Sequence, residues 1–261
     1  MPDPVPPRAP TATPARYLFV SDVHLDAAAP EGQRQFLEFL RTHGASAAAR
    51  GEGARALYIL GDLFESWVGD DDSQGDRSAV LAALRQLTSS GIACFLLHGN
   101  RDFLIGQDFC RQTGCELLPD PVVAEIDGER VLLTHGDALC TDDHAYQELR
   151  SIVRIPAWQR RFLALSLADR QLLANEARAG SRVHTAHSIP TIMDVNTAAV
   201  SAAFKAARVR RMIHGHTHRP AVHDALVEGQ PVQRIVLGSW HEQGSYLAYE
   251  NGRYELRALP R

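Results

Sequence analysis

Histidine and aspartate side chains recur in short polar motifs that directly follow apolar stretches of this chain. The segment "RMIHGHTHRP", residues 211–220, places His214, His216 and His218 within five positions, between an apolar run and a proline. A single histidine is more often a surface or hydrogen-bonded core residue than a ligand. Three imidazoles on the loop after a buried strand instead favour a functional site, because such loops carry binding and catalytic groups.

Four further motifs place carboxylate, amide or imidazole groups in the same setting. "SDVHLD" contains Asp22 and His24, "LGDLFE" contains Asp62, "HGNRDF" contains Asn100 and "LTHGD" contains His135. If the preceding strands are neighbours in a sheet, their ends converge and these oxygen and nitrogen atoms face one small volume. Such a ligand supply fits two divalent metal ions about 3.5–4 Å apart, bridged by a carboxylate. The expected metal ligands are Asp22, His24, Asp62, Asn100, His135, His216 and His218.

The elements that must position these residues alternate between strands and helices in the first half of the chain. The runs "YLFV", "RALYIL" and "IACFLL" predict buried strands, and "EGQRQFLEFLRTH", "RSAVLAALRQLTSS" and "FLIGQDFCRQTG" predict helices. Later in the chain, Asp127-Gly128 and Asn251-Gly252 stand between β-prone runs and predict hairpin turns. The pattern is typical of an α/β protein to which antiparallel strands are added.

Composition places the chain among ordinary soluble globular proteins. Its 261 residues are 45% hydrophobic and 22% charged, enough for one large domain or a domain with an insertion. No apolar run approaches the ~20 residues of a transmembrane helix, and the N-terminus lacks an apolar signal core. Residues 1–15, rich in Pro, Ala and Thr, are predicted to form a disordered tail. The spacing of the four cysteines matches neither a zinc site nor a disulfide framework. We therefore expect them to be reduced, structural thiols of a cytoplasmic protein; they are Cys94, Cys110, Cys115 and Cys140.

The order of the motifs, D-x-H, G-D, G-N, H-G and G-H-x-H, resembles that of the calcineurin-like metallophosphoesterases over most of the chain. The longer blocks "ILGDLFESWVGDDD", "HGNRDFLIG", "THGDALCTDDHAYQ", "IMDVN" and "MIHGHTHRP" are similar to the UDP-2,3-diacylglucosamine pyrophosphohydrolases of lipid A biosynthesis. This resemblance implies a four-layer α/β/β/α sandwich with a helical insertion lid, and two Mn²⁺ ions. It also implies two ligand sets, Asp22, His24, Asp62 and His218 for one ion and Asp62, Asn100, His135 and His216 for the other.

The activity implied by the resemblance is hydrolysis of the pyrophosphate bond of UDP-2,3-diacylglucosamine. Metal-bound water would attack the α-phosphorus and give UMP and 2,3-diacylglucosamine 1-phosphate (lipid X), with catalytic roles for Asp62, Asn100, Arg101 and His216. Two other classes compete with this hypothesis, another dimetal phosphodiesterase such as a nuclease and a noncatalytic scaffold. The complete ligand set argues against a scaffold. The net charge of −4 and the lack of a broad basic track argue against nucleic acid as a partner.

Arg101 follows Asn100 at a position where many members of the wider superfamily have histidine. That histidine can protonate an alkoxide leaving group, whose conjugate acid is about as weak as water, with a pKa of roughly 15.7. A phosphate monoester has a second pKa of roughly 6, so it can depart unprotonated when cations stabilise its charge. Arginine supplies a permanent charge and a planar fork of donors. The substitution therefore favours a pyrophosphate substrate, with an unengaged surface arginine as the alternative.

Residues 144–193 break the α/β rhythm of the chain. They are predicted to form a helical insertion lid between two segments of the phosphoesterase core, residues 16–143 and 194–261. Within the insertion, Pro156 suits a first helical turn and the "SLAD" segment that starts at Ser166 suits the cap of a second helix. We therefore expect a helical hairpin.

Arginine and apolar residues are combined in this insertion. Trp158, Phe162 and Leu165 fall at i, i+4 and i+7, and residues 150–182 hold seven arginines against two carboxylates, a local net charge of +5. This combination suits an anionic membrane surface, where a double-chain lipid would reside. A helix pair that simply packs on the sandwich is the alternative, and the resemblance favours a lid over acyl chains. The protein is accordingly expected to be a monomer bound peripherally to the cytoplasmic face of the bacterial inner membrane.

The same resemblance implies contacts with the nucleotide-sugar lipid substrate from Asn100, Arg101, Asp143, Ser181 and His216. Before "IMDVN", members of that family usually present a serine, an asparagine and a lysine. The corresponding residues here are Ser181, Thr185 and Ser188, so only the serine matches. Loss of the lysine removes a positive charge near the sugar phosphate. Candidate replacement donors are Arg182, His184 and His187.

Overall fold

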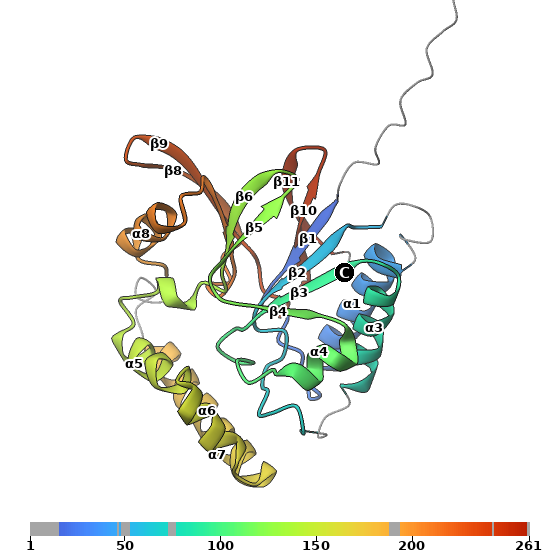
Figure 1. The fold of residues 1–261 in the computed structure, drawn as a ribbon. Coiled ribbons are helices and arrows are strands. Elements are labelled where there is room, and N and C mark those ends of the chain that lie inside the picture. Colours follow the sequence, from blue (N-terminus) through green and yellow to red (C-terminus); the bar gives the residue numbers. More distant parts are fainter. Residues whose placement is uncertain are drawn as a thin grey trace, which may run out of the picture.

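The computed structural model describes residues 16–45, 47, 53–72, 77–187, 194–241 and 243–259. Its strands form two sheets, one of six strands and one of five, with helices on the outer face of each (Figure 1). The predicted disordered tail, residues 1–15, lies outside the described residues. Among the described residues, no helix is both long and apolar enough to span a bilayer.

The first sheet contains the strands predicted in the first half of the chain. Its order is β11-β10-β1-β2-β3-β4, in which β1 to β4 are parallel neighbours and β10 and β11 pair antiparallel. Side chains alternate across β1, so Phe19 faces the second sheet while Val20 faces the helices. The strands are β1 (Tyr17–Val20), β2 (Ala56–Leu60), β3 (Ala93–Leu97), β4 (Glu116–Leu118), β10 (Ser245–Glu250) and β11 (Arg253–Ala258).

The second sheet has the order β5-β6-β7-β9-β8. Its three central strands run parallel, and β5 and β8 are antiparallel edge strands. The strands are β5 (Val122–Ile126), β6 (Glu129–Leu133), β7 (Arg211–His214), β8 (Ala221–Val227) and β9 (Gln230–Val236). Both predicted hairpins are confirmed, with positive φ at Asp127-Gly128 and at Asn251-Gly252. A third hairpin turn, Glu228-Gly229, joins β8 to β9 and was not predicted.

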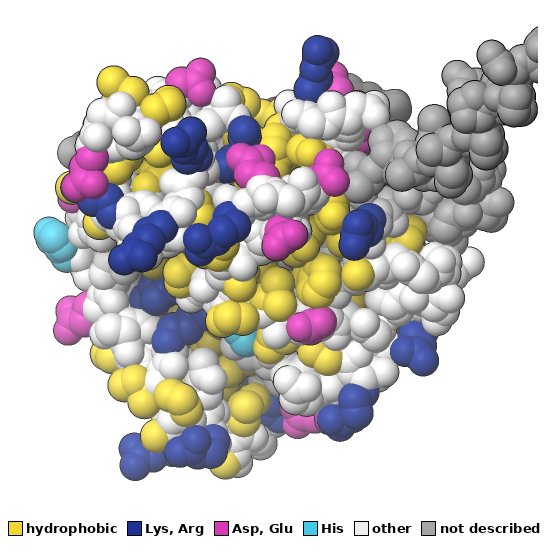
Figure 2. All heavy atoms as spheres, turned by 45° about the horizontal axis from the view of Figure 1, so that its top comes forward, with side chains coloured by type: hydrophobic (Ala, Val, Ile, Leu, Met, Phe, Trp, Pro, Cys, Tyr) yellow, Lys and Arg dark blue, Asp and Glu magenta, His cyan; other side chains and the backbone are white. Residues whose placement is uncertain are grey.

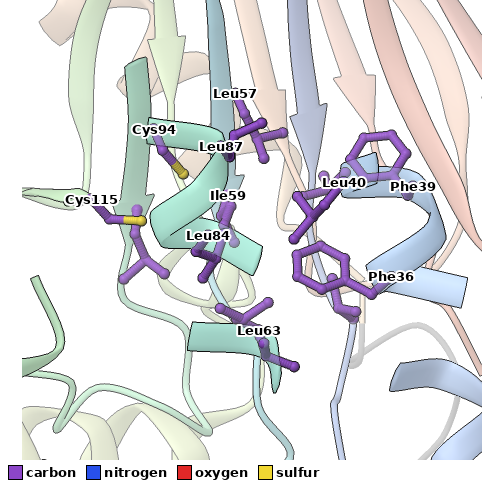
Figure 3. Packing of buried hydrophobic residues seen from close by; sticks show 14 of the residues in the cluster. Phe36, Phe39, Leu40, Leu57, Ile59, Leu63, Leu84, Leu87, Cys94 and Cys115 are labelled. Carbon is purple, nitrogen blue, oxygen red and sulfur yellow. The ribbon is translucent and has the colours of Figure 1, made fainter. Parts of the chain in front are cut away.

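Helices cover both outer faces of the paired sheets. The first sheet carries α1 (Pro30–Leu40), the short turn η1 (Arg41–Ala45), α3 (Ser78–Ser89) and α4 (Gln107–Thr113); the second carries η2 (Asp137–Leu139) and α8 (Thr197–Ala207). Figure 3 shows Phe36, Phe39 and Leu84 from α1 and α3 packed against Leu57 and Ile59 of β2. A second apolar layer, which includes Phe19 and Ile213, fills the space between the sheets. The predicted four-layer α/β/β/α sandwich is confirmed.

The segment predicted as an insertion projects from one end of the sandwich (Figure 1). Its described part, residues 144–187, contains three helices, α5 (His144–Val153), α6 (Pro156–Leu163) and α7 (Leu167–His187). The expected starts of two helices agree with the structure, because Pro156 opens α6 and Ser166 Oγ accepts from the Asp169 backbone N at 3.2 Å. The expected hairpin of two helices is wrong, because the described residues of the insertion form three. The extra helix, α5, is capped by Asp143, whose carboxylate accepts from Tyr146 N at 3.0 Å.

Candidate metal centre

The candidate ligands lie on loops that follow β1, β2, β3, β6 and β7. Five of them have a positive φ, between 52° and 67°, namely Asp22, His24, Asp62, His216 and His218. Residues other than glycine rarely adopt this conformation, and each instance costs free energy that the surrounding structure must offset. Its concentration on the predicted ligands indicates a functional constraint on where these side chains lie.

Asp22, His24 and His218 form one group of ligand atoms. His218 Nε2 lies 3.3 Å from both Asp22 Oδ1 and His24 Nε2. His24 Nε2 lies 3.9 Å from Asp22 Oδ1 and 3.7 Å from Asp62 Oδ2. Asp22 Oδ1 is buried and makes no well-formed hydrogen bond within the described part of the chain. Imidazole lone pairs and an unsatisfied carboxylate oxygen that converge in this way fit a cation between them.

Asn100, His135 and His216 form a second group beside the first. Asn100 Oδ1 lies 2.9 Å from His135 Nε2 and 3.0 Å from His216 Nδ1. Asp62 stands between the two groups, because its Oδ1 is 3.8 Å from His135 Nε2 while its Oδ2 faces His24. The structure therefore brings all seven sequence-predicted ligands together, with the Asp62 carboxylate between the two groups.

Hydrogen bonds behind the site orient the imidazoles and the Asp62 carboxylate. His24 Nδ1 bonds Glu65 Oε2 at 2.9 Å, and His135 Nδ1 lies 2.9 Å from the Leu60 carbonyl. Each bond leaves Nε2 directed toward the site, as in metal centres where an outer partner fixes the ligand. The backbone N of Arg101 donates to Asp62 Oδ1 at 2.8 Å. Among these partners, Glu65 was not predicted from the sequence.

A second unpredicted residue, Asp102, joins the loops that carry Asp62 and Asn100. Its buried carboxylate accepts from Leu63 N at 2.7 Å and from Gly99 N at 2.8 Å. Burial and the nearby charge of Asp62 raise the pKa of Asp102, while the bond from Gly99 opposes this shift. Asp102 thus fixes the spacing of two ligand loops at an electrostatic cost.

Burial and charge shift the titration of the site histidines in opposite directions. Burial by itself lowers the pKa of His135, but the carboxylates of Asp62 and Asp22 outweigh it and raise that pKa to about 9. Burial and the neighbouring His135 lower the pKa of His216 to about 4. Burial opposes ionisation of Asp22, yet the histidines around it hold its pKa below the usual range. Two buried carboxylates therefore attract positive charge, for which protons and metal ions compete.

A polar network connects α5 with the site. The buried Asp137 accepts from Arg150 Nε at 2.8 Å and from the Tyr146 hydroxyl, and Arg154 Nη2 donates to the Gly99 carbonyl at 2.8 Å. Burial opposes ionisation of Asp137, but His135 and Arg150 lower its pKa. A cavity of about 350 Å³ lies beside this network, lined by His98, Leu117, Leu118, Pro119, Asp120, Arg150 and Arg154.

Two histidines next to the ligands, His98 and His214, form hydrogen bonds to groups outside the set of candidate ligands. His98 Nε2 donates to the Ile105 carbonyl at 2.8 Å, and His214 Nε2 accepts from Arg234 at 3.0 Å. The helix α7 includes Ser181 and Thr185, but the structure does not describe their side chains, and Ser188 lies outside the described residues. These substrate contacts therefore stay predictions, as does the contact expected from Asp143.

Comparison with known proteins identifies the class to which this fold and site belong. The family model described as calcineurin-like phosphoesterase matches residues 15–220, so the chain belongs to this family, whose metallophosphoesterase members use divalent metal ions. Within it, the chain is 49% identical over 243 residues to the UDP-2,3-diacylglucosamine hydrolase of Pseudomonas paraeruginosa, covering 93% of this chain and 98% of that protein. Proteins of the same name from Aeromonas hydrophila subsp. hydrophila and Salmonella arizonae are 47% identical over 239 residues and 46% identical over 243 residues. These alignments cover 92% and 93% of this chain, and 96% and 98% of the relatives.

Proposed function

We propose that this protein hydrolyses the pyrophosphate bond of UDP-2,3-diacylglucosamine to give UMP and 2,3-diacylglucosamine 1-phosphate. The observation that carries the proposal is the position of Asp62, whose two oxygens face two groups of ligand atoms. A bridged dimetal centre of this kind clamps and polarises phosphoryl groups. The substrate follows from relatives that are 46–49% identical over about 93% of the chain and carry the name UDP-2,3-diacylglucosamine hydrolase.

The two cations are assigned as Mn²⁺. One would be held by Asp22, His24, Asp62 and His218, and the other by Asp62, Asn100, His135 and His216. The donor set suits this ion, because carboxylate and amide oxygens are ligands that Mn²⁺ accepts, and imidazoles complete the coordination. When bound, the cations supply a water of lowered pKa and hold the oxygens of the phosphate under attack.

Side chains of the protein position the substrate and stabilise the negative charge of its phosphates. Arg101 is tied to the site through its backbone bond to Asp62, and its guanidinium carries a permanent charge for the attacked or the departing phosphate. Asn100 and His216 hold the phosphate side of the site, and Asp143 and Ser181 contact the substrate beyond it. The leaving group is a phosphate monoester, so no general acid is needed to release it.

The insertion is proposed to be a lid over the acyl chains that also contacts an anionic membrane surface. Its helices α5 and α6 contain no buried residue, and the exposed large hydrophobic residues include Leu149, Ile152, Ile155, Leu163, Leu165, Leu172 and Leu173. Figure 2 shows apolar and basic side chains side by side at the lower edge of the molecule, where Figure 1 places these helices. Helices that served only to pack on the sandwich would bury this apolar surface. We accordingly propose a monomeric, peripheral protein at the cytoplasmic face of the inner membrane.

Hydrolysis in oxygen-18 water tests both the reaction and the bond that is attacked. With Mn²⁺ and UDP-2,3-diacylglucosamine, we expect the label in UMP, because the acyl chains under the lid anchor the sugar phosphate as the leaving side. Label in the lipid phosphate would mean that the other phosphorus is attacked and that the substrate lies in the opposite direction. A parallel reaction with single-stranded and duplex DNA serves as the comparison. Turnover of DNA without turnover of the lipid would refute the proposed function.

A further inference from the structure

A fourth imidazole-bearing loop reaches the group formed by Asp22, His24 and His218. The ring of His241 stacks on that of His24, with centroids 4.9 Å apart and an angle of 14° between the planes. Its centroid is 5.6 Å from that of His218. One ring nitrogen from each of these three histidines lies within 4.8 Å of the other two. None of the sequence motifs that predict the site contains His241.

The loop that carries His241 is held against the site by its preceding residue. The backbone N of Trp240 donates to the carbonyl of Asp22 at 3.1 Å. The Trp240 side chain is buried and packs edge-on against Phe36 and Phe39, with both centroid distances 5.6 Å. Because Trp240 is fixed at both its backbone and its ring, the chain enters His241 from a defined position next to the loop that carries Asp22.

The ring nitrogens and the carboxylate oxygen next to His241 have too few N–H donors among them to satisfy one another by hydrogen bonds. His24 uses Nδ1 to bond Glu65, and its Nε2 faces His218 Nε2 at 3.3 Å. Asp22 Oδ1 is buried without a well-formed hydrogen bond among the described residues. A cation at this point would accept lone pairs from His24 Nε2, His218 Nε2 and Asp22 Oδ1. A ring nitrogen of His241 lies within 4.8 Å of one from His24 and one from His218.

We propose that His241 is an additional ligand of the cation held by Asp22, His24, Asp62 and His218. The inference rests on the dimetal centre of the proposed function and extends its ligand set from seven residues to eight. With five protein ligands, this ion would have fewer open positions for water and substrate than the other ion, which would be held by four. Substrate oxygens would then bind chiefly to the other ion and to Arg101.

Metal titration of substitution variants separates ligation from ring stacking. The apo forms of the wild type, His241→Ala and His241→Phe are titrated with Mn²⁺ and followed by electron paramagnetic resonance, without substrate. Phenylalanine keeps a flat ring over His24 but has no nitrogen. If His241 is a ligand, both variants should weaken one Mn²⁺ site at least tenfold, since even the loss of an outer partner typically costs 10–100-fold. His223→Ala, on strand β8, is the matched control and should retain both sites.

Counting metal-coupled imidazoles provides an independent measurement. Protein labelled with ¹⁵N-histidine and loaded with ¹¹³Cd²⁺ should show five imidazoles with scalar coupling to cadmium, and His241→Ala should show four. Wild-type affinity in His241→Phe, or four coupled imidazoles in the wild type, would overturn the proposal. Protein that binds metal normally but does not hydrolyse UDP-2,3-diacylglucosamine would contradict the proposed substrate and leave the ligand assignment intact. Wild-type protein that binds neither Mn²⁺ nor Cd²⁺ would overturn the dimetal centre and His241 with it.

Discussion

Replacing Arg170 by methionine should release helix α7 from the core without unfolding the sandwich. Arg170 is 2% exposed, although it lies on the otherwise exposed insertion. Its Nη1 donates to the Val68 carbonyl at 2.6 Å and to Asp71 Oδ1 at 2.8 Å. Gly69 permits this close approach, because a Cβ there would lie 2.3 Å from Arg170 Nη1. These contacts fix α7 to the loop after β2, which also carries the site.

The size of the effect follows from these contacts. A hydrogen bond from a charged donor contributes roughly 1.5–3 kcal/mol. The ion pair adds only about 0–1 kcal/mol, because the Asp71 side chain is 65% exposed and solvent screens it. Methionine keeps most of the apolar stem and removes the cost of burying a charge, which offsets part of the loss. A net cost of about 2 kcal/mol to docking of α7 corresponds to a roughly 30-fold larger open fraction.

Amide hydrogen exchange measures this opening directly. Peptides from residues 167–180 should exchange roughly 30-fold faster in Arg170→Met, because an undocked helix frays, while peptides from β2 and β3 keep their protection. Arg161→Met, an exposed arginine on α6, removes the same charge without a buried contact and should exchange like the wild type. Equal protection of α7 in the two variants would refute the anchoring role of Arg170.

Two further predictions concern the site and the lid. Asp62→Ala should abolish turnover and metal retention, because this carboxylate faces both ligand groups. The fold should persist, because the substitution also removes a like charge near Asp102. Metal content, circular dichroism and activity after stringent chelation measure these effects, and turnover that survives chelation would contradict the metal mechanism. Polar replacement of both Trp158 and Phe162, whose rings stack 5.1 Å apart, should reduce hydrolysis of a long-chain substrate far more than that of a short, water-soluble analogue. Equal losses on the two substrates would show that these rings act through stability alone, a role that the contact of Phe162 with the core makes a real alternative.

Local sequence signals predicted the turns only where the residue type and the backbone conformation agree. Asp-Gly and Asn-Gly are the usual residues of a tight hairpin with positive φ, and both such turns were found. Glu228-Gly229 makes the same kind of turn, with a φ of 52° at Glu228. Glutamate has no local preference for this conformation, so the hairpin is imposed by the pairing of β8 with β9 rather than signalled by the turn itself.

The candidate ligands could be predicted because each lies directly after an apolar strand, whereas the residues that orient them could not. Glu65 meets His24 across 41 positions of the chain, and Asp102 meets Leu63 across 39. His241 reaches His24 from the opposite end of the sequence. No spacing within one motif encodes such a contact, because it depends on how strands β1, β2 and β3 are ordered in the sheet and on where the loop after β9 packs.

Charge counted along the sequence overstates what the insertion offers to a membrane. Of the seven arginines in residues 150–182, Arg150 bonds Asp137, Arg154 bonds the Gly99 carbonyl and Arg170 bonds Val68 and Asp71. These three guanidinium groups hold the insertion to the core. Exposed Arg160 and Arg161 lie on α6, among the exposed apolar residues of the insertion. At about 1 kcal/mol per basic residue near an anionic surface, the loss of the three core-bound groups from the count lowers the available electrostatic attraction by about 3 kcal/mol. The proposed membrane affinity therefore depends more on the exposed leucines and isoleucines of α5 to α7 than the net charge of the segment indicates.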